Sequence, residues 1–155
     1  MAADFEIKLT PEGKKFKKQL EELTKLEVAV GYQKGQGSED GVDMADIALF
    51  NELGTVHIPS RPFIRDSLNN NKDKITQFMQ KAAKGIANGS SAEDVLKQIG
   101  VFQKGLIQKE ITNGSFEPNK QSTIDRKGSD KPLIDTGRMR QSVNFVIRKK
   151  GGGSD

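Results

Sequence analysis

The chain of 155 residues carries 25 Lys or Arg against 21 Asp or Glu, a net charge of +4 with a pI near 9.2, which suits one soluble domain with a modest core. The absence of cysteine excludes disulfides, thiolate catalysis, cysteine-based zinc sites and iron–sulfur clusters, and it favours an intracellular origin. No apolar run approaches the roughly 20 residues that cross a bilayer, and the N-terminus lacks a basic-then-apolar signal sequence, so we expect no membrane partner.

Strand and helix signals alternate in the N-terminal part of the chain. Residues 5–7 alternate apolar and charged side chains and predict a short strand. Thr10 is a good helix cap, and Pro11 suits the first helical position. The apolar face of the predicted helix comprises Phe16, Leu20 and Leu23. Residues 26–32 alternate again and predict a second strand beside the first, before a flexible, glycine-rich loop at 34–41.

A short helix and a stiff connector follow this loop. Asp43 is a good cap for the helix, and Gly54 is a good stop. Its apolar side chains are Ile47, Phe50 and Leu53. Pro59 and Pro62 fix their own φ angles and push the residue before each of them toward extended geometry, so the chain enters the next helix through a rigid segment.

Two amphipathic helices are predicted in the middle of the chain. Residues 69–71 interrupt the first turns of one of them, and Asn88-Gly89 ends it. Its apolar stripe comprises Ile75, Met79, Ala82 and Ile86. Ser90 and Glu93 predict a capping box for the next helix, which we expect to run antiparallel to the first. The stripe of this second helix comprises Val95, Ile99, Phe102 and Leu106.

Periodicity disappears over residues 112–131, which predicts a long irregular excursion with at most a short helix near 119–126. Asp135 or Thr136 then predicts a cap for one turn of helix, and residues 143–147 alternate as a final strand.

These elements predict an α+β fold. We expect a small, mainly antiparallel sheet of three or more strands packed against amphipathic helices, with long irregular loops. One domain would span residues 1–150, and residues 151–155 would form a flexible tail.

Residues that could carry chemistry are sparse. His57 is the only histidine, and without carboxylate or cysteine companions it predicts a connector residue, not a metal ligand. The glycines of the 34–41 loop fit neither G-x-G-x-x-G nor the P-loop pattern. Asp135-Thr136-Gly137 resembles the active-site triplet of retroviral-type aspartic proteases, but only one strand and the tail follow it, which leaves no room for a flap. We therefore expect a helix cap there, and no enzyme, metal site or cofactor.

Two strings, well separated in sequence, carry a family resemblance. The first is Ile47–Thr55, followed almost at once by Ile58–Ile64, and the second is Pro132–Ser142. In this order, after a strand that ends in Val30-Gly31, they resemble the tail-completion and head-to-tail joining proteins of long-tailed bacteriophages. The resemblance spans roughly residues 26–147, and the chain departs from the family pattern in its polar loop and its basic N-terminal helix.

The resemblance implies a structural virion protein of the phage neck or tail top, made in the host cytoplasm and working as an oligomeric ring by assembly, not chemistry. Its expected partners are copies of itself, adjacent head-completion proteins, tail-tube or tail-terminator proteins, and genomic DNA contacted non-specifically in the channel. The expected assembly and docking residues are Asn51, Glu52, Gly54, Thr55, Pro59, Arg61, Pro62, Phe63, Asp135, Thr136, Gly137 and Arg138.

The alternative is a phage-encoded, DNA-associated accessory protein with a non-specific basic surface. Basic residues at 14–18, 138–140 and 148–150 could form a positive face. Aromatic residues do not interleave with them, which argues against a platform that stacks single-stranded bases.

Overall fold

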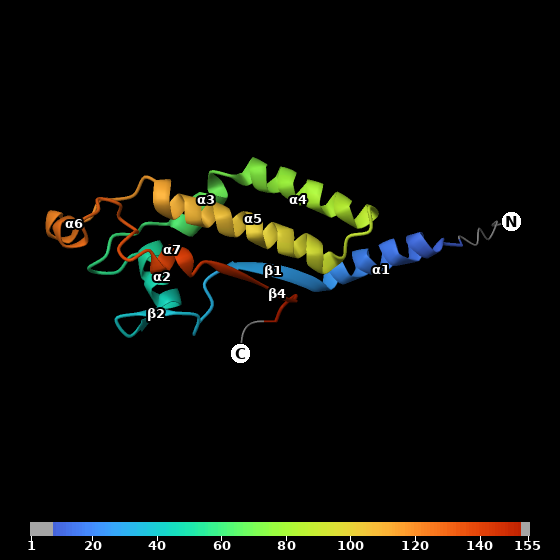
Figure 1. The fold of residues 1–155 in the computed structure, drawn as a ribbon, viewed down its shortest axis with the longest axis horizontal. Coiled ribbons are helices and arrows are strands. Elements are labelled where there is room, and N and C mark those ends of the chain that lie inside the picture. The colour runs from blue at the N-terminus through green and yellow to red at the C-terminus, as the bar shows by residue number, and fades with distance from the viewer. Residues whose placement is uncertain (1–7, 153–155) are drawn as a thin grey trace.

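The structure is a computed structural model that describes residues 8–152, an α+β arrangement of helices and short antiparallel strands (Figure 1). The helices are α1 (Pro11–Lys25), α2 (Met44–Leu53), α3 (Phe63–Asn69), α4 (Lys72–Ala87), α5 (Ala92–Asn113), α6 (Gln121–Lys127) and α7 (Arg138–Gln141). The strands are β1 (Leu26–Gly31), β2 (Ser38–Glu39), β3 (Val42–Asp43) and β4 (Asn144–Lys149). The strand predicted at residues 5–7 and the end of the predicted tail, residues 153–155, lie outside the described residues.

The main sheet is an antiparallel ribbon of β1 and β4. Its register joins Leu26 to Lys149 at one end and Gly31 to Asn144 at the other, so the strand after α1 pairs with the last strand of the chain. Within residues 8–152 this sheet and the second one have two strands each, so the predicted sheet of three or more strands is not confirmed.

The second sheet is a small hairpin of β2 and β3 at the end of the segment predicted to be a flexible loop. Its turn, Asp40-Gly41, has φ angles of 50° and 81°, and two consecutive positive φ values form the tight turn that Asp-Gly favours. Asp43 holds the base of the loop, because its carboxylate accepts hydrogen bonds from the Gly35 N–H at 2.7 Å and from the Ala45 N–H at 2.8 Å. These hydrogen bonds lower the pKa of the Asp43 carboxyl, and the second of them confirms the predicted cap of α2.

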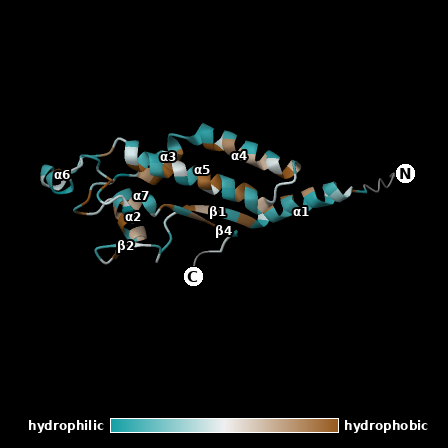
Figure 2. Cartoon of the chain, viewed as in Figure 1, coloured by the Kyte–Doolittle hydropathy of each residue, from teal (hydrophilic) through white to brown (hydrophobic). Residues whose placement is uncertain are grey.

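The long helix α5, 22 residues, lies between the β1–β4 ribbon and α4 (Figure 1). Gly100 allows the ribbon to approach, because a Cβ atom there would lie 2.6 Å from the ring of Phe145 in β4. Figure 2 shows apolar and polar residues alternating along α4 and α5. The predicted stripes meet in a buried cluster of Ala82, Ile86, Val95 and Ile99, whereas Met79 of the first stripe stays exposed. We call this cluster and the residues around it the helical end.

The helix caps match the sequence signals at α1 and α2 but not at α5. The Thr10 hydroxyl accepts a hydrogen bond from the Gly13 N–H at 3.0 Å, as predicted for α1. The cap of α5 is Ser91, which accepts from the Asp94 N–H at 3.0 Å, so the predicted capping box of Ser90 and Glu93 is wrong by one residue. The Ser90 N–H instead donates to the carbonyl of Gly85 and belongs to the turn that ends α4.

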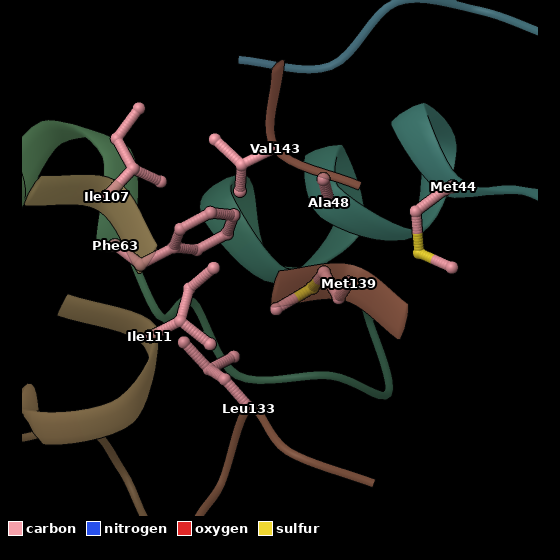
Figure 3. Close-up of a cluster of buried hydrophobic side chains, with 8 residues drawn as sticks. All are labelled: Met44, Ala48, Phe63, Ile107, Ile111, Leu133, Met139 and Val143. Atoms are coloured by element: carbon pink, nitrogen blue, oxygen red, sulfur yellow. The ribbon is translucent and has the colours of Figure 1, made fainter. Parts of the chain in front are cut away.

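A second buried cluster lies where α2, α3, α5 and α7 meet (Figure 3). Phe63, the first residue of α3, is fully buried and lies among Ile107, Ile111 and Val143. Its ring meets the ring of Tyr32 edge to face, with 6.1 Å between centroids. The remaining members are Met44, Ala48, Leu133 and Met139. We call the two segments that converge here, residues 38–64 and 131–143, the junction.

Candidate assembly site

The fold brings the two strings of the family resemblance together at the junction. Both line one hollow of about 470 Å³, to which the β2–β3 hairpin and α6 also contribute. The first string supplies Ile47, Asn51 and Ile58 to this hollow, and the second supplies Pro132, Leu133, Asp135, Thr136, Gly137 and Met139. Segments far apart in the sequence therefore form one surface.

Polar contacts tie the second string to the β2–β3 hairpin. The Thr136 hydroxyl donates to the Glu39 carboxylate at 2.6 Å, and the Arg138 guanidinium donates to the Ser38 carbonyl at 3.2 Å. Behind them, the Tyr32 hydroxyl donates to the carbonyl of Met139 at 2.8 Å. The hairpin, the end of β1 and α7 are thus fixed relative to one another.

The N-terminus of α3 is capped by a side chain from another helix. Pro62 occupies the N-cap position of α3 and has no side-chain donor or acceptor for the free N–H groups. The carboxylate of Glu52 in α2 fills this role, because it accepts hydrogen bonds from the N–H groups of Ile64 at 2.9 Å and Arg65 at 3.1 Å. A negative charge at the positive end of a helix is favourable, so Glu52 locks α2 to α3.

Arg61 is a buried clamp on the segment that leads to α6. Its guanidinium donates to the Glu117 carbonyl at 2.8 Å, the Asn119 side-chain oxygen at 3.0 Å and the Pro118 carbonyl at 3.4 Å. Its backbone N–H donates to the Asn51 carbonyl at 2.6 Å. Burial lowers the pKa of the guanidinium, and the nearby Glu117 carboxylate opposes this change. Arg61 is one of the expected docking residues, but its contacts with residues 117–119 could not be predicted, because no local sequence pattern links the two loops.

The conformation of the turn after α2 depends on Gly54 and Thr55, the two residues that follow the helix. Gly54 has φ 78°, and a Cβ atom there would lie 2.8 Å from the backbone nitrogen of Ser60. The Thr55 hydroxyl accepts hydrogen bonds from the N–H groups of His57 at 3.1 Å and Ile58 at 3.0 Å. His57 is therefore a residue of an exposed turn, and Pro59 is the half-buried residue that follows this turn.

The end of the second string differs in detail from its prediction. The predicted turn of helix is present as α7, but its N-cap is Gly137, with φ 81°, and not Asp135 or Thr136. The Thr136 hydroxyl still accepts from the Arg138 N–H at 3.3 Å. The Asp135 carboxylate instead pairs with Arg126 of α6 at 3.2 Å. The helix begins only at Arg138, because Gly137 has the left-handed conformation and cannot be part of a right-handed helix.

Ten of the twelve expected docking residues fall into two groups, and the other two, Pro59 and Gly137, are half-buried. The first group is engaged within the chain: Asn51, Glu52, Gly54, Arg61, Pro62 and Phe63 hold α2, α3 and the 117–119 segment together. Others present exposed side chains: Thr55, Asp135, Thr136 and Arg138. A docking role for the exposed group stays a prediction.

An exposed apolar surface on α2 was not foreseen. The predicted helix was expected to carry the apolar Ile47, Phe50 and Leu53, but Phe50 and Leu53 are exposed, and the residues that α2 buries are Met44 and Ala48. α2 is apolar on more than one side, so its sequence alone does not show which side packs inward. The apolar side chains left outside are Leu49, Phe50 and Leu53, which we call the α2 face. Val56, just beyond the helix, is 96% exposed.

The described residues show neither a metal-binding cluster nor a membrane-spanning helix, and comparison with known proteins does not identify a family. Within residues 8–152, no group of three or more His, Asp or Glu is placed to hold a metal ion. Among the helices of the same span, none combines the length and apolar character that crossing a membrane requires. Comparison of the chain with family models, curated proteins and solved structures found no match of any of the three kinds.

Proposed function

We propose that this chain is a structural virion protein of the bacteriophage neck or tail top, forming an oligomeric ring that completes the tail and joins it to the DNA-filled head. The observation that carries the proposal is the convergence at the junction of the two strings that resemble tail-completion proteins. Its work would be assembly, without catalysis.

The surface beside the junction supports an assembly role. The α2 face leaves Leu49, Phe50 and Leu53 exposed to solvent, on the helix that lines the hollow with Ile47 and Asn51. Apolar side chains gathered on one side of a short helix are typical of a protein contact surface. The exposed Thr55, Asp135, Thr136 and Arg138 would form the polar rim of this contact, toward a neighbouring copy or an adjacent neck, tail-tube or terminator protein.

The β1–β4 ribbon fits the same proposal. Each of its strands has one partner within residues 8–152, so each has a second edge open to pairing in that part of the structure. We infer that the assembled protein has a sheet of three or more strands, to which a strand of a neighbouring copy would add.

The deciding experiment is electron microscopy of lysates from a phage or prophage that lacks this gene. Filled heads beside unattached tails of normal length would establish the joining role. Overlong tails would move the protein to the tail-terminator position. Intact infectious virions would refute a place in the neck and leave the DNA-associated alternative.

One observation favours that alternative. α1 exposes Lys14, Lys15, Lys17 and Lys18, which could face the phosphates of a duplex either in the channel of a ring or in a free complex. Binding of the purified protein to duplex DNA, measured across salt, separates the two cases. Loss of all binding near physiological ionic strength indicates incidental contact, whereas retained binding supports a dedicated DNA-binding role.

A further inference from the structure

We infer, resting on the proposed ring, that an exposed apolar face of α1 docks on the α2 face of a second copy of this chain. Phe16 and Leu20 of α1 form the first of these surfaces, which we call the α1 face. They are four residues apart, so their side chains share one side of the helix. Leu9, which is also exposed, lies just before the Thr10 cap.

The apolar side chains of both faces are exposed to solvent in the single chain. Phe16 and Leu20 are 40% and 41% exposed, and Leu53 is 67% exposed. Phe16 also borders a hollow of about 270 Å³ between α1 and the end of α4, which is apolar at Ile86 and Ala87 and polar elsewhere, at Glu12, Lys15 and Gln19 among others. A protruding leucine of another copy would enter its apolar side, beside Phe16.

One chain cannot bring its own two faces together. Along the longest axis of the molecule, α1 projects toward one end, and α2 lies toward the other end, beside the β2–β3 hairpin (Figure 1). α1 packs against α4, α5 and β1, and the side chain of Gln19 accepts a hydrogen bond from the Ala92 N–H at 2.8 Å, which fixes it in that direction. The occupant of each face must therefore come from another molecule.

Charge complementarity points to a copy of the same chain. α1 carries five Lys against three Glu, and Lys15 and Lys17 flank Phe16. Residues 35–60, which include the α2 face, carry five acidic residues and no Lys or Arg. Asp46 lies on the α2 face itself, three residues before Leu49 and four before Phe50, and its partner within the chain is the highly exposed Lys34 at 3.2 Å. Opposite potentials of this kind orient two surfaces and suppress self-pairing of like faces.

The contact is heterologous, because two different surfaces meet. Repetition of such a contact closes a ring when the rotation between neighbours divides a full turn. A variant that lacks one face keeps only one competent surface. It therefore cannot pair with itself, but it can pair once with a variant that lacks the other face.

The test uses two variants and their mixture, measured by sedimentation velocity and native mass spectrometry. Phe16→Glu/Leu20→Glu destroys the α1 face, and Leu49→Lys/Leu53→Lys destroys the α2 face; these side chains are exposed, so both variants should fold. The wild-type protein should assemble, each variant alone should be a monomer, and an equal mixture should stop at twice the 17.0 kDa subunit mass. Val101→Lys, at a 56% exposed position on α5, is the matched control and should assemble like the wild type.

A second measurement uses the lack of cysteine in the chain. Phe16→Cys/Leu53→Cys should give a ladder of disulfide-linked oligomers on oxidation, and each single variant should give none. A dimer of the Phe16→Cys variant alone would indicate a symmetric contact and overturn the inference. So would a monomeric wild-type protein at high concentration, variants that assemble normally, or a mixture that stays monomeric. The deletion phenotype tests the proposed function separately, so a ring built through other surfaces would refute only this contact.

Discussion

The junction and the helical end bury apolar cores of similar kind but are held by different means. At the helical end, buried residues such as Ala82, Ile86 and Val95 follow the helical period, and neighbouring turns place them. At the junction, single polar side chains such as Glu52 and Arg61 reach backbone groups of distant segments. The difference teaches that the helical end should tolerate substitution, whereas the junction depends on individual residues that cannot be replaced by similar ones.

The largest expected difference in stability is between alanine variants of two phenylalanines, one in each region. Phe63→Ala should reduce the free energy of unfolding by about 3–5 kcal/mol, because the fully buried ring leaves a cavity between α3 and α5. Phe78→Ala at the helical end should cost only about 1–2 kcal/mol, since Phe78 is half-buried and stacks on Phe102 at 4.1 Å. Urea denaturation of both variants measures the difference. Equal losses would contradict the view that the junction is the less tolerant region.

Arg61 should rank second. Arg61→Met keeps much of the side-chain volume but leaves the carbonyls of Glu117 and Pro118 without their donor, which should cost about 2–3 kcal/mol. Hydrogen exchange should also rise in the segment before α6. Arg61→Lys is the control, and it should not restore stability, because an ammonium cannot reproduce the planar fork of the guanidinium. Full rescue by lysine would show that only the charge matters.

Alanine substitutions at two glycines of α5 should change the free energy of unfolding in opposite directions. Gly100→Ala should destabilise by about 1–2 kcal/mol, because the new methyl group would lie 2.6 Å from the Phe145 ring and overpacking outweighs the gain in helix propensity. Gly105→Ala has no atom within 4 Å of the added Cβ and should stabilise by up to about 1 kcal/mol. Thermal unfolding measures both. Stabilisation by Gly100→Ala would mean that β4 can move away from α5 at little cost.

Local signals account for what sequence analysis predicted correctly. The caps at Thr10 and Asp43 and the stop at Gly54 depend on atoms within a few residues, so they can be read from the chain. The exposure of Phe50 and the contacts of Arg61 depend on which distant segment arrives beside them, and no local pattern contains that information. The docking candidates were identified as a group, but their division into internal clamps and exposed side chains required the fold.

Tyr32 gives a pH test of the junction. Burial, and to a lesser degree the Glu52 carboxylate, raises the pKa of its phenol above the ordinary value of 10.0. A raised pKa in the folded state means that stability is complete below pH 10 and is lost as the pH rises beyond it. Because Tyr32 is the only tyrosine, tyrosinate absorbance in the ultraviolet follows this group alone. Absorbance should rise together with loss of circular dichroism.

The matched variant for this pH test is Tyr32→Phe, which removes the hydrogen bond to the Met139 carbonyl and should cost about 1 kcal/mol at neutral pH. It should also weaken the loss of stability at alkaline pH. A tyrosinate that forms near pH 10 in the intact fold would show that solvent reaches the ring.

The smallest effect is expected at Asp135, at the exposed edge of the junction. Its carboxylate pairs with Arg126 at 3.2 Å, and the two side chains are 44% and 66% exposed, so water screens their attraction. Asp135→Asn should therefore change the free energy of unfolding by less than about 1 kcal/mol. A double-mutant cycle with Arg126→Ala measures the pair directly. A coupling well above this limit would make Asp135 a structural clamp like Arg61, and loss of a peptidase activity in Asp135→Asn would revive the protease interpretation of Asp135-Thr136-Gly137. If neither occurs, the carboxylate is free to serve a contact outside its own chain, as the ring proposal requires.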